Sequence, residues 1–145
     1  MIYNLNNEAD RQSFREFGKK LMDKRCVVEL KERKPKRSLP QNSYLHFCLA
    51  YFASEFGYGL EEVKYDIYKR MVNKDIYTRV RKNRRGQDVV YMRSSRDLDT
   101  DEMSITIDRF RNYSMNAAGL YIPEPHEEDA FVEAEKQIAE FERYL

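Results

Sequence analysis

The sequence contains few of the residues that cross-link, ligate or catalyse. Cysteine and histidine occur twice each, glycine five times and proline four times among 145 residues, and tryptophan is absent. Because Cys26 and Cys48 are the only cysteines and form no CxxC pair, neither a disulfide framework nor a zinc site is expected. We expect both thiols to be small buried apolar groups in a reducing cytoplasm.

Long hydrophobic runs and nucleotide-binding signatures are also missing. No apolar run reaches about eighteen residues, so no transmembrane span and no membrane partner are expected. The opening MIYNLNNEADRQSF lacks the basic and apolar regions of a secretory signal. Neither GxxxxGK[ST] nor GxGxxG is present to bind phosphates. His46 and Cys48, two positions apart on a predicted helix, point to different faces, and His126 lies among acidic residues. We therefore expect no enzyme, and no catalytic residue, metal or cofactor.

Charge is abundant but unevenly distributed. Charged residues make up 35% of the chain, yet the formal net charge is only +1. Residues 1–96 contain 22 Lys and Arg against 12 Asp and Glu, whereas residues 97–145 contain 4 against 13. The asymmetry indicates a basic face for a polyanion and an acidic region that shields it or binds elsewhere. Two solvated faces of one domain are the alternative interpretation.

The length and the 41% hydrophobic content fit a single domain over residues 1–145. Hydrophobic patterning predicts an α+β fold with short strands, a β-hairpin and about five helices. Strands are predicted over residues 1–5 and 25–32, and hairpin strands over 76–82 and 88–95 around the turn 83–87. Helices are predicted to begin near residues 7, 40, 60, 99 and 127.

Helical spacing defines the faces that we expect to be buried. The inward residues are Phe14, Phe17, Leu21 and Met22 in the first helix, Leu45, Cys48, Leu49, Phe52 and Phe56 in the second, Val63, Ile67 and Met71 in the third, and Phe131, Val132, Ala134, Ile138, Phe141 and Leu145 in the last. Ser38 is the expected N-cap of the second helix. Asp99 and Glu102 form a possible capping pair, and Gly119 is expected to end that helix.

Two basic segments are candidates for binding a nucleic acid. In the predicted hairpin, Tyr77, Arg79 and Arg81 share one face of a strand, so an aromatic ring lies beside two guanidinium groups. Proteins that bind single strands combine a cationic track with rings on which bases stack. No recognition helix, zinc finger or basic zipper is present, so sequence-specific reading is not indicated. The basic candidates are Arg33, Lys34, Lys36 and Arg37 in the loop, and Arg79, Arg81, Lys82, Arg84 and Arg85 in the hairpin.

Two alternatives belong to other functional classes. Glu29 and Lys31, on a predicted strand, resemble the pair with which some Mg²⁺-dependent nucleases hold the metal and position water. Such a site also needs an acidic partner, for which Asp10 and Asp23 are the candidates. The alternation of Glu and Lys with apolar residues is equally what a half-exposed strand shows, and we favour that interpretation. The other alternative is an adaptor that binds proteins through the acidic C-terminal region.

The stretch RSLPQN, from Arg37 to Asn42, resembles a motif of the NinB/Orf family of phage recombination proteins. In that family a strand ending in charged residues leads to an R-S-x-x-Q-N motif that opens a long helix. VVELKERKPKRSLPQNSYLHFCLAYFA follows the same plan, and DTDEMSITIDRFRNYSMNAAGLYIPEP is loosely similar to the family's late helix. This chain departs from the pattern by Pro35 within the basic run, by the arginine-rich hairpin and by the acidic last helix.

The resemblance implies a homodimeric recombination mediator without catalytic activity. Such a protein binds single-stranded DNA, contacts the host single-strand-binding protein and helps to load a recombinase. In the matching motif, Arg37 can bind a phosphate through two parallel hydrogen bonds. Gln41 and Asn42, at the start of a helix, can offer amides to phosphate or bases. Equally, Ser38, Gln41 and Asn42 can cap the helix and hold the loop, and both interpretations stay open.

Overall fold

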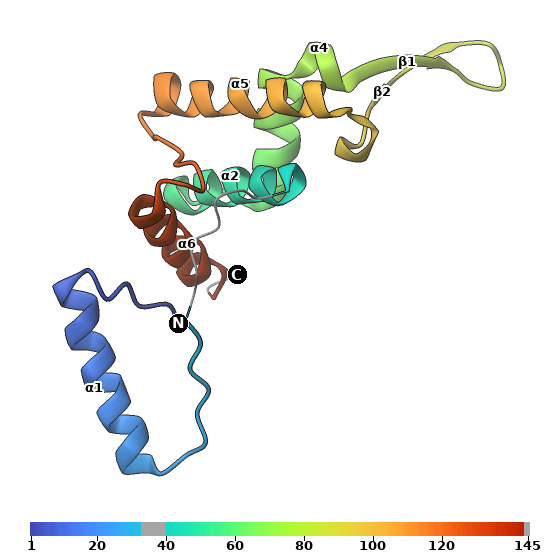
Figure 1. The fold of residues 1–145 in the computed structure, drawn as a ribbon. Coiled ribbons are helices and arrows are strands. Elements are labelled where there is room, and N and C mark those ends of the chain that lie inside the picture. The colour runs from blue at the N-terminus through green and yellow to red at the C-terminus, as the bar shows by residue number, and fades with distance from the viewer. Residues whose placement is uncertain (33–39, 144–145) are drawn as a thin grey trace. The chain divides into compact units, whose positions relative to one another are not determined.

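The computed structural model describes residues 1–32 and 40–143, and the contacts between Cα atoms divide the chain into two compact units. The first unit combines Met1–Ser38 with Pro123–Leu145, and the second is Leu39–Ile122. Helices dominate both units, and a two-stranded antiparallel sheet belongs to the second (Figure 1). The α+β class is confirmed, whereas the expectation of one domain stays a prediction.

Helices α2 (Gln41–Phe56) and α5 (Thr100–Ala118) contribute most of the core of the second unit. The inward face predicted for α2 is buried except at Phe56, which lies in the last turn and is exposed. Phe52 meets Phe110 of α5 edge to face, with the ring centroids 5.4 Å apart. Aromatic pairs in this geometry add to the free energy gained by burying apolar surface.

The two cysteines lie in different environments. Cys48 is wholly buried in the core, and this burial raises the pKa of its thiol to about 12. Cys26 is exposed, so the prediction of two buried thiols is right for Cys48 and wrong for Cys26. Cys26 follows the end of the first helix, where nothing in the described part of the chain covers it.

The ends of α2 and α5 show which capping predictions hold. Pro40 occupies the N-cap position of α2 without a capping side chain. The predicted N-cap, Ser38, lies outside the described residues. Asp99 and Glu102 form the expected capping box of α5, in which Asp99 accepts from the Glu102 N–H at 2.8 Å. Gly119 ends α5 at φ 69°, a left-handed conformation that favours glycine.

The third predicted helix is a mixed segment whose centre is a π-helix. Its parts are α3 (Leu60–Glu62), the π-helix η1 (Val63–Val72) and α4 (Lys74–Tyr77). A π-helix bonds each N–H five residues back, as the Asn73 N–H does to the Tyr68 carbonyl at 3.1 Å. Val63, Tyr68 and Asn73 are all wholly buried at this spacing of five. The prediction of an inward Met71 assumed the α-helical period and is wrong, because Met71 is exposed.

A chain of buried hydrogen bonds joins this segment to α5. The hydroxyls of Tyr68 and Tyr77 lie 2.6 Å apart, and Tyr68 donates to Thr106 Oγ1 at 2.8 Å. Thr106 in turn donates to the Met103 carbonyl at 2.8 Å. Asn73 Nδ2 bonds the carbonyls of Tyr68 and Thr106 at 3.0 and 3.2 Å. Because buried polar groups are costly when unpaired, these bonds specify how the π-helix meets α5.

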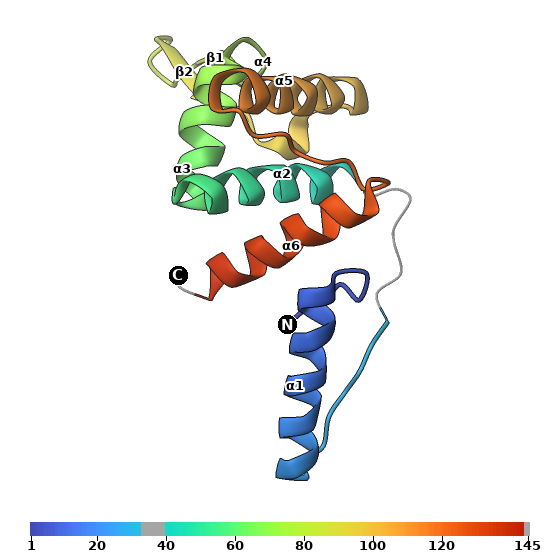
Figure 2. The same ribbon diagram turned by 90° about the vertical axis from the view of Figure 1, so that its left-hand side faces the viewer.

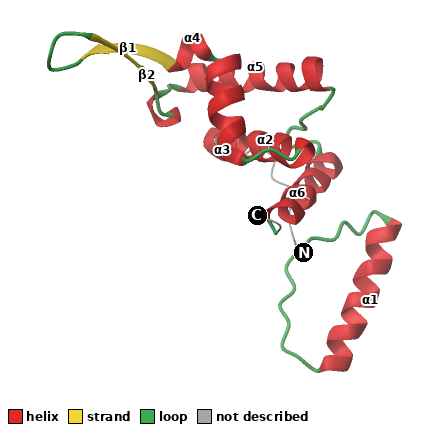
Figure 3. Ribbon diagram, turned by 180° about the vertical axis from the view of Figure 1, so that it is seen from behind, coloured by secondary structure: helices red, strands yellow, loops and turns green. Residues whose placement is uncertain are grey.

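The predicted β-hairpin is confirmed. Strands β1 (Thr78–Lys82) and β2 (Asp88–Met92) pair antiparallel in the register Thr78 to Met92 and Lys82 to Asp88. The first strand begins two residues later than predicted, since Ile76 and Tyr77 belong to α4. The hairpin extends away from the helices of its unit (Figure 3), and a single 3₁₀ turn, η2 (Ser95–Asp97), leads from it to α5.

The first unit contains helices α1 (Glu8–Lys24) and α6 (Glu128–Glu142). Asn7 caps α1, accepting from the N–H of Ala9 at 2.9 Å, and the predicted start of this helix is confirmed. Asp10 of α1 forms an ion pair with Lys136 of α6, and both side chains are half-buried. Asp10 also accepts a hydrogen bond from the Asn4 N–H at 2.9 Å. These bonds, with that to Lys136 the largest cause, hold the pKa of Asp10 below its usual value.

The burial of the first unit is less complete than predicted. The apolar stripe on α1 contains no buried residue; Phe14 and Leu21 are half-buried, and Phe17 and Met22 are exposed. In α6, Phe131 and Ala134 are buried and the other predicted inward residues are half-buried, apart from Leu145, which lies outside the described residues.

Two predicted strands do not form within the described residues. Residues 1–5 and 26–32 are neither helix nor strand, so the prediction of strands over 1–5 and 25–32 is wrong. A β-strand requires a neighbour to pair its N–H and C=O groups, and β1 and β2 pair only with each other. The β-branched residues of 26–32 favour a strand locally, but no described segment pairs with them as a partner strand. Among the described residues, no helix is long and apolar enough to cross a membrane.

Candidate nucleic-acid interface

The turn of the hairpin is held by one side chain. Asn83 Oδ1 accepts from the backbone N–H of Arg85 at 2.9 Å and from that of Gln87 at 3.0 Å. Gly86 adopts φ 75°, which an L side chain rarely tolerates, and its N–H donates to the Asn83 carbonyl at 3.0 Å. The five-residue loop is therefore ordered by local bonds, and it presents Arg84 and Arg85 at the tip.

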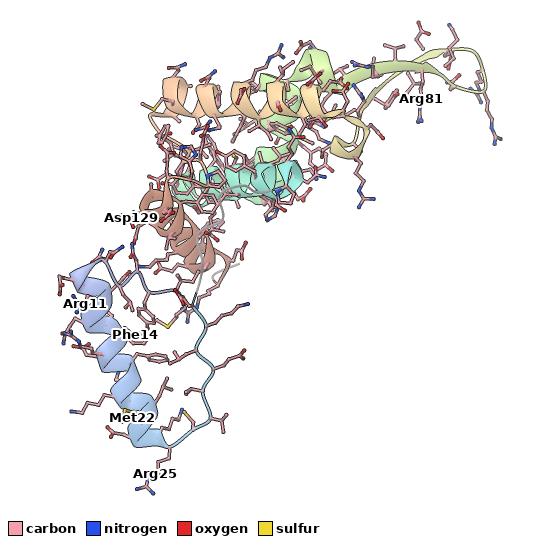
Figure 4. All side chains as sticks on the ribbon, viewed as in Figure 1. Arg11, Phe14, Met22, Arg25, Arg81 and Asp129 are labelled. Carbon is pink, nitrogen blue, oxygen red and sulfur yellow. The ribbon has the colours of Figure 1, made fainter. Side chains whose placement is uncertain are left out.

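One face of the hairpin combines guanidinium groups with an aromatic ring. Arg79 pairs directly with Tyr91 across the strands, and Arg81 lies diagonally from Tyr91 on the same face. The Arg81 guanidinium lies over the Tyr91 ring, 5.2 Å from its centroid. The Arg81 side chain stays exposed (Figure 4). Tyr91 is 38% exposed. Both the cation and part of the ring are thus accessible to a ligand.

The opposite face of the hairpin is apolar in its middle. Val80 and Val90 pair directly across the two strands, and both are exposed. At the far end of the strands Lys82 pairs with Asp88, with Nζ 3.0 Å from Oδ1 and both side chains in solvent. Residues 78–93 contain six Lys and Arg against one Asp, so the hairpin is strongly basic although Lys82 is partly neutralised.

The five hairpin candidates differ in how much of their charge is used inside the fold. Arg79 donates to the carbonyls of Asp75 and Thr78 at 3.1 and 3.0 Å, and it is half-buried. Arg84 and Arg85 are exposed, and their side chains make no hydrogen bond or ion pair within the part of the chain that the structure describes. Arg81 faces Tyr91, and Lys82 faces Asp88. Arg81, Arg84 and Arg85 therefore offer the most accessible positive charge.

The base of the hairpin is anchored by charged side chains that serve the fold. Arg93 donates to Glu102 Oε2 at 2.9 Å and to the Asp97 carbonyl at 2.7 Å. The guanidinium of Arg93 is the main reason that the pKa of Glu102 lies below its ordinary value. Lys69 Nζ, almost fully buried, donates to the Arg93 carbonyl at 3.0 Å and lies 4.9 Å from the Tyr77 ring centroid. Burial lowers the pKa of Lys69.

The other predicted site residues are placed as follows. Arg33, Lys34, Lys36 and Arg37 lie outside the described residues. Gln41 Nε2 donates to Ser104 Oγ at 2.8 Å and to the Thr100 carbonyl at 3.2 Å, so its amide joins the start of α2 to α5. Asn42 is exposed. These bonds link Gln41 to α5 and do not cap α2, so whether Gln41 and Asn42 contact DNA stays a prediction.

The residues proposed for a nuclease are not gathered into a site. Glu29 and Lys31 are exposed on a segment that has no neighbouring strand among the described residues, and Asp10 forms an ion pair with Lys136. Asp23 is exposed near the end of α1. Within residues 1–32 and 40–143, no group of three or more His, Cys, Asp or Glu side chains could hold a metal ion.

Sequence reasoning selected the wrong tyrosine as the ring of this face. Tyr77, expected beside Arg79 and Arg81, is wholly buried at the end of α4. Tyr91 takes the position instead, from the opposite strand. The signal was present in the sequence, because a five-residue loop at 83–87 sets the register that places residue 91 opposite residue 79.

Comparison with protein families, with characterised proteins and with solved structures finds no match for this chain.

Proposed function

We propose that this protein binds single-stranded DNA through its hairpin, with Arg81, Arg84 and Arg85 contacting phosphates and Tyr91 stacking on a base. The observation that carries the proposal is the exposed face on which the Arg81 guanidinium lies over the Tyr91 ring, next to a turn with two exposed arginines. Cations along a backbone track and an accessible ring are the two elements of sequence-tolerant single-strand binding.

The biological setting proposed for this activity comes from the resemblance at Arg37 to Asn42. It is phage-type recombination in the cytoplasm, in which the protein acts as a homodimeric mediator without catalysis. The host single-strand-binding protein is the proposed protein partner, and the task is to help load a recombinase. The basic loop with Arg33, Lys34, Lys36 and Arg37 supplies further phosphate contacts in this proposal.

The proposal is tested by titrating labelled single- and double-stranded DNA of about 20 nucleotides, longer than one site, at several salt concentrations. Fluorescence anisotropy is measured in EDTA and then in Mg²⁺. Tight binding to the single strand without cleavage is the expected result, with an affinity that falls steeply as salt rises. Cleavage that requires Mg²⁺ would support a nuclease instead, and absence of binding at low salt would leave the adaptor.

The variant Arg84→Ala/Arg85→Ala tests whether the hairpin is the surface that binds DNA. Removing two phosphate contacts should reduce the slope of log K against log salt by about 1.4, since each contact on a single strand contributes about 0.7. The matched control is Lys19→Ala/Lys20→Ala, which removes the same charge from exposed positions on α1. Equal slopes for the two variants would show that net charge, and not the hairpin, governs binding. A third variant, with Ala at Arg33, Lys34, Lys36 and Arg37, measures how much the basic loop contributes to DNA binding and to its salt dependence.

A further inference from the structure

The segment of residues 26–32, CVVELKE, is exposed although its composition suits a sheet. It contains no helix, turn or bend, and it leads back from the end of α1 in the direction opposite to that helix (Figure 2). Val27 is fully exposed, and Leu30 and Val28 are 76% and 51% exposed. Among the described residues, none of its backbone groups takes part in a backbone–backbone hydrogen bond. Such an unpaired, apolar stretch is a template for another strand.

We propose that this segment pairs with the same segment of a second copy of the chain, forming an antiparallel two-stranded sheet across a twofold axis at Leu30. In an antiparallel pair of identical strands, each residue lies opposite the one at equal distance on the other side of the axis. With the axis at Leu30, Glu29 of each copy lies opposite Lys31 of the other. Two cross-strand ion pairs therefore form in one register.

Neighbouring registers of the same pairing are less complementary than the axis at Leu30. An axis at Glu29 or at Lys31 places two like charges directly opposite each other, and an axis between Leu30 and Lys31 places Glu29 opposite Glu32. An axis between Glu29 and Leu30 pairs charges only with apolar residues. An axis between Lys31 and Glu32 also places these opposite charges across from each other, but it places Leu30 opposite Arg33. Among these registers, only the axis at Leu30 combines two ion pairs with two apolar side chains opposite each other, and it is the register that we propose.

The pairing also gathers apolar side chains that solvent now surrounds. Since side chains alternate along a strand, Val28 and Leu30 of both copies lie on one face of the new sheet, where Leu30 lies opposite Leu30 and Val28 opposite Glu32. Helix α1, which directly precedes the segment, has an apolar stripe with no buried residue, and its Phe17 and Met22 are exposed. Met22 is labelled in Figure 4. The stripe supplies the additional apolar area that a stable interface needs beyond five paired residues.

Exchanging the charges tests the register without removing apolar surface. The mass is measured by light scattering after size exclusion, from about 1 to about 100 μM. We expect a dimer for the natural chain. Glu29→Lys and Lys31→Glu should each weaken it by about tenfold or more, because each places two like-charged pairs across the axis. The double variant Glu29→Lys/Lys31→Glu restores opposite charges and should restore dimerisation. A monomer at every concentration, or a double variant as weak as the single ones, would overturn the proposal.

A disulfide across the axis gives a second, independent measurement. In a Cys26→Ser background, Leu30→Cys places a thiol opposite itself, within the reach of a disulfide after small adjustment. Val27→Cys is the control, since its two copies would lie about 20 Å apart along the ladder. Rapid oxidation to a covalent dimer for Leu30→Cys alone is expected. Equal cross-linking of both variants would exclude this axis. This inference rests on the homodimer of the proposed function and adds its interface. Neither measurement involves DNA, so the proposed DNA binding is tested separately by its own titration.

Discussion

At the scale of residues, Tyr91 can be compared with a similar tyrosine elsewhere in its unit. Tyr91 and Tyr121 are both exposed, and each has an arginine guanidinium over its ring, at 5.2 and 5.8 Å from the centroid. Only Tyr91 belongs to the basic hairpin. A loss of DNA binding that is confined to Tyr91 therefore separates stacking at a cationic site from a general effect of losing an aromatic ring.

Tyr91→Ala is expected to weaken binding of single-stranded DNA by about 1–3 kcal/mol, the range for one base stacked on an aromatic ring. Tyr91→Phe keeps the ring and should bind nearly as well as the natural chain. Anisotropy titrations at one salt concentration give the affinities, and circular dichroism confirms that the variants are folded. An unchanged affinity for Tyr91→Ala, or an equal loss for Tyr121→Ala, would show that no base stacks on Tyr91.

Single residues also show where charge is used by the fold. Arg79 was predicted from the sequence to contact phosphate, yet it bonds carbonyl groups at the base of the hairpin, as Arg93 also does. Gln41 likewise bonds α5. A donor is recognisable from its residue type alone, but whether it is already engaged depends on residues distant in the sequence, as Ser104 is from Gln41.

At the scale of elements, the π-helix η1 (Val63–Val72) determines which side chains of its segment are inside. Asn73 terminates it and bonds α5 through Thr106, while its Oδ1 has no hydrogen-bond partner in the described part of the chain. The five-residue hydrogen-bond spacing of the π-helix was not predicted, because an amphipathic sequence is expected to follow the 3.6-residue turn of an α-helix. The prediction for Met71 failed for this reason.

Asn73→Ala is expected to lower the free energy of unfolding by about 1–3 kcal/mol, since it removes two buried hydrogen bonds and leaves the Thr106 carbonyl without this donor. Asn73→Asp should be more damaging, because it places a carboxylate against two carbonyl oxygens. Urea denaturation followed by circular dichroism measures both. Asn42→Ala, at an exposed position, should change stability by less than about 0.5 kcal/mol. A similarly small effect of Asn73→Ala would contradict this role.

Other elements were predictable because their determinants are local. The hairpin follows from β-branched residues around a loop that contains Gly86, and the start of α5 from the capping pair three residues apart. The strands predicted at residues 1–5 and 25–32 failed because pairing is a property of two segments, and local preference cannot supply the second one.

At the scale of the whole molecule, folding redistributes the charge that the linear sequence separates. The acidic residues 123–145 belong to the same unit as the basic residues 1–38. Residues 39–122 contain 13 Lys and Arg against 11 Asp and Glu, and the remaining residues contain 13 against 14. Each unit is thus nearly neutral. The positive potential that a polyanion would meet in the second unit is therefore concentrated on the hairpin.

Burial differs between the two units, which predicts unequal local stability. Helix α1 has no buried residue, whereas α2 has seven, among them Cys48 and Phe52. Hydrogen exchange should therefore be fast in the amides of α1 and slow in those of α2 and α5, since local opening of α1 exposes little apolar surface. The measurement uses the Glu29→Lys variant, in which the proposed pairing is broken. Protection of α1 equal to that of α2 would contradict this expectation.

The sequence by itself determined the helix-rich α+β composition, the hairpin, the cap of α5 and the concentration of arginine at the turn. Each depends on residues within a few positions of one another, where backbone preference and side-chain caps act. The tertiary structure alone decided that Tyr77 is buried while Tyr91 is exposed, that Gln41 bonds α5, and that η1 follows a five-residue period. These outcomes depend on packing and hydrogen bonds between segments far apart in the chain, such as that of Tyr68 with Thr106, which local preference does not encode.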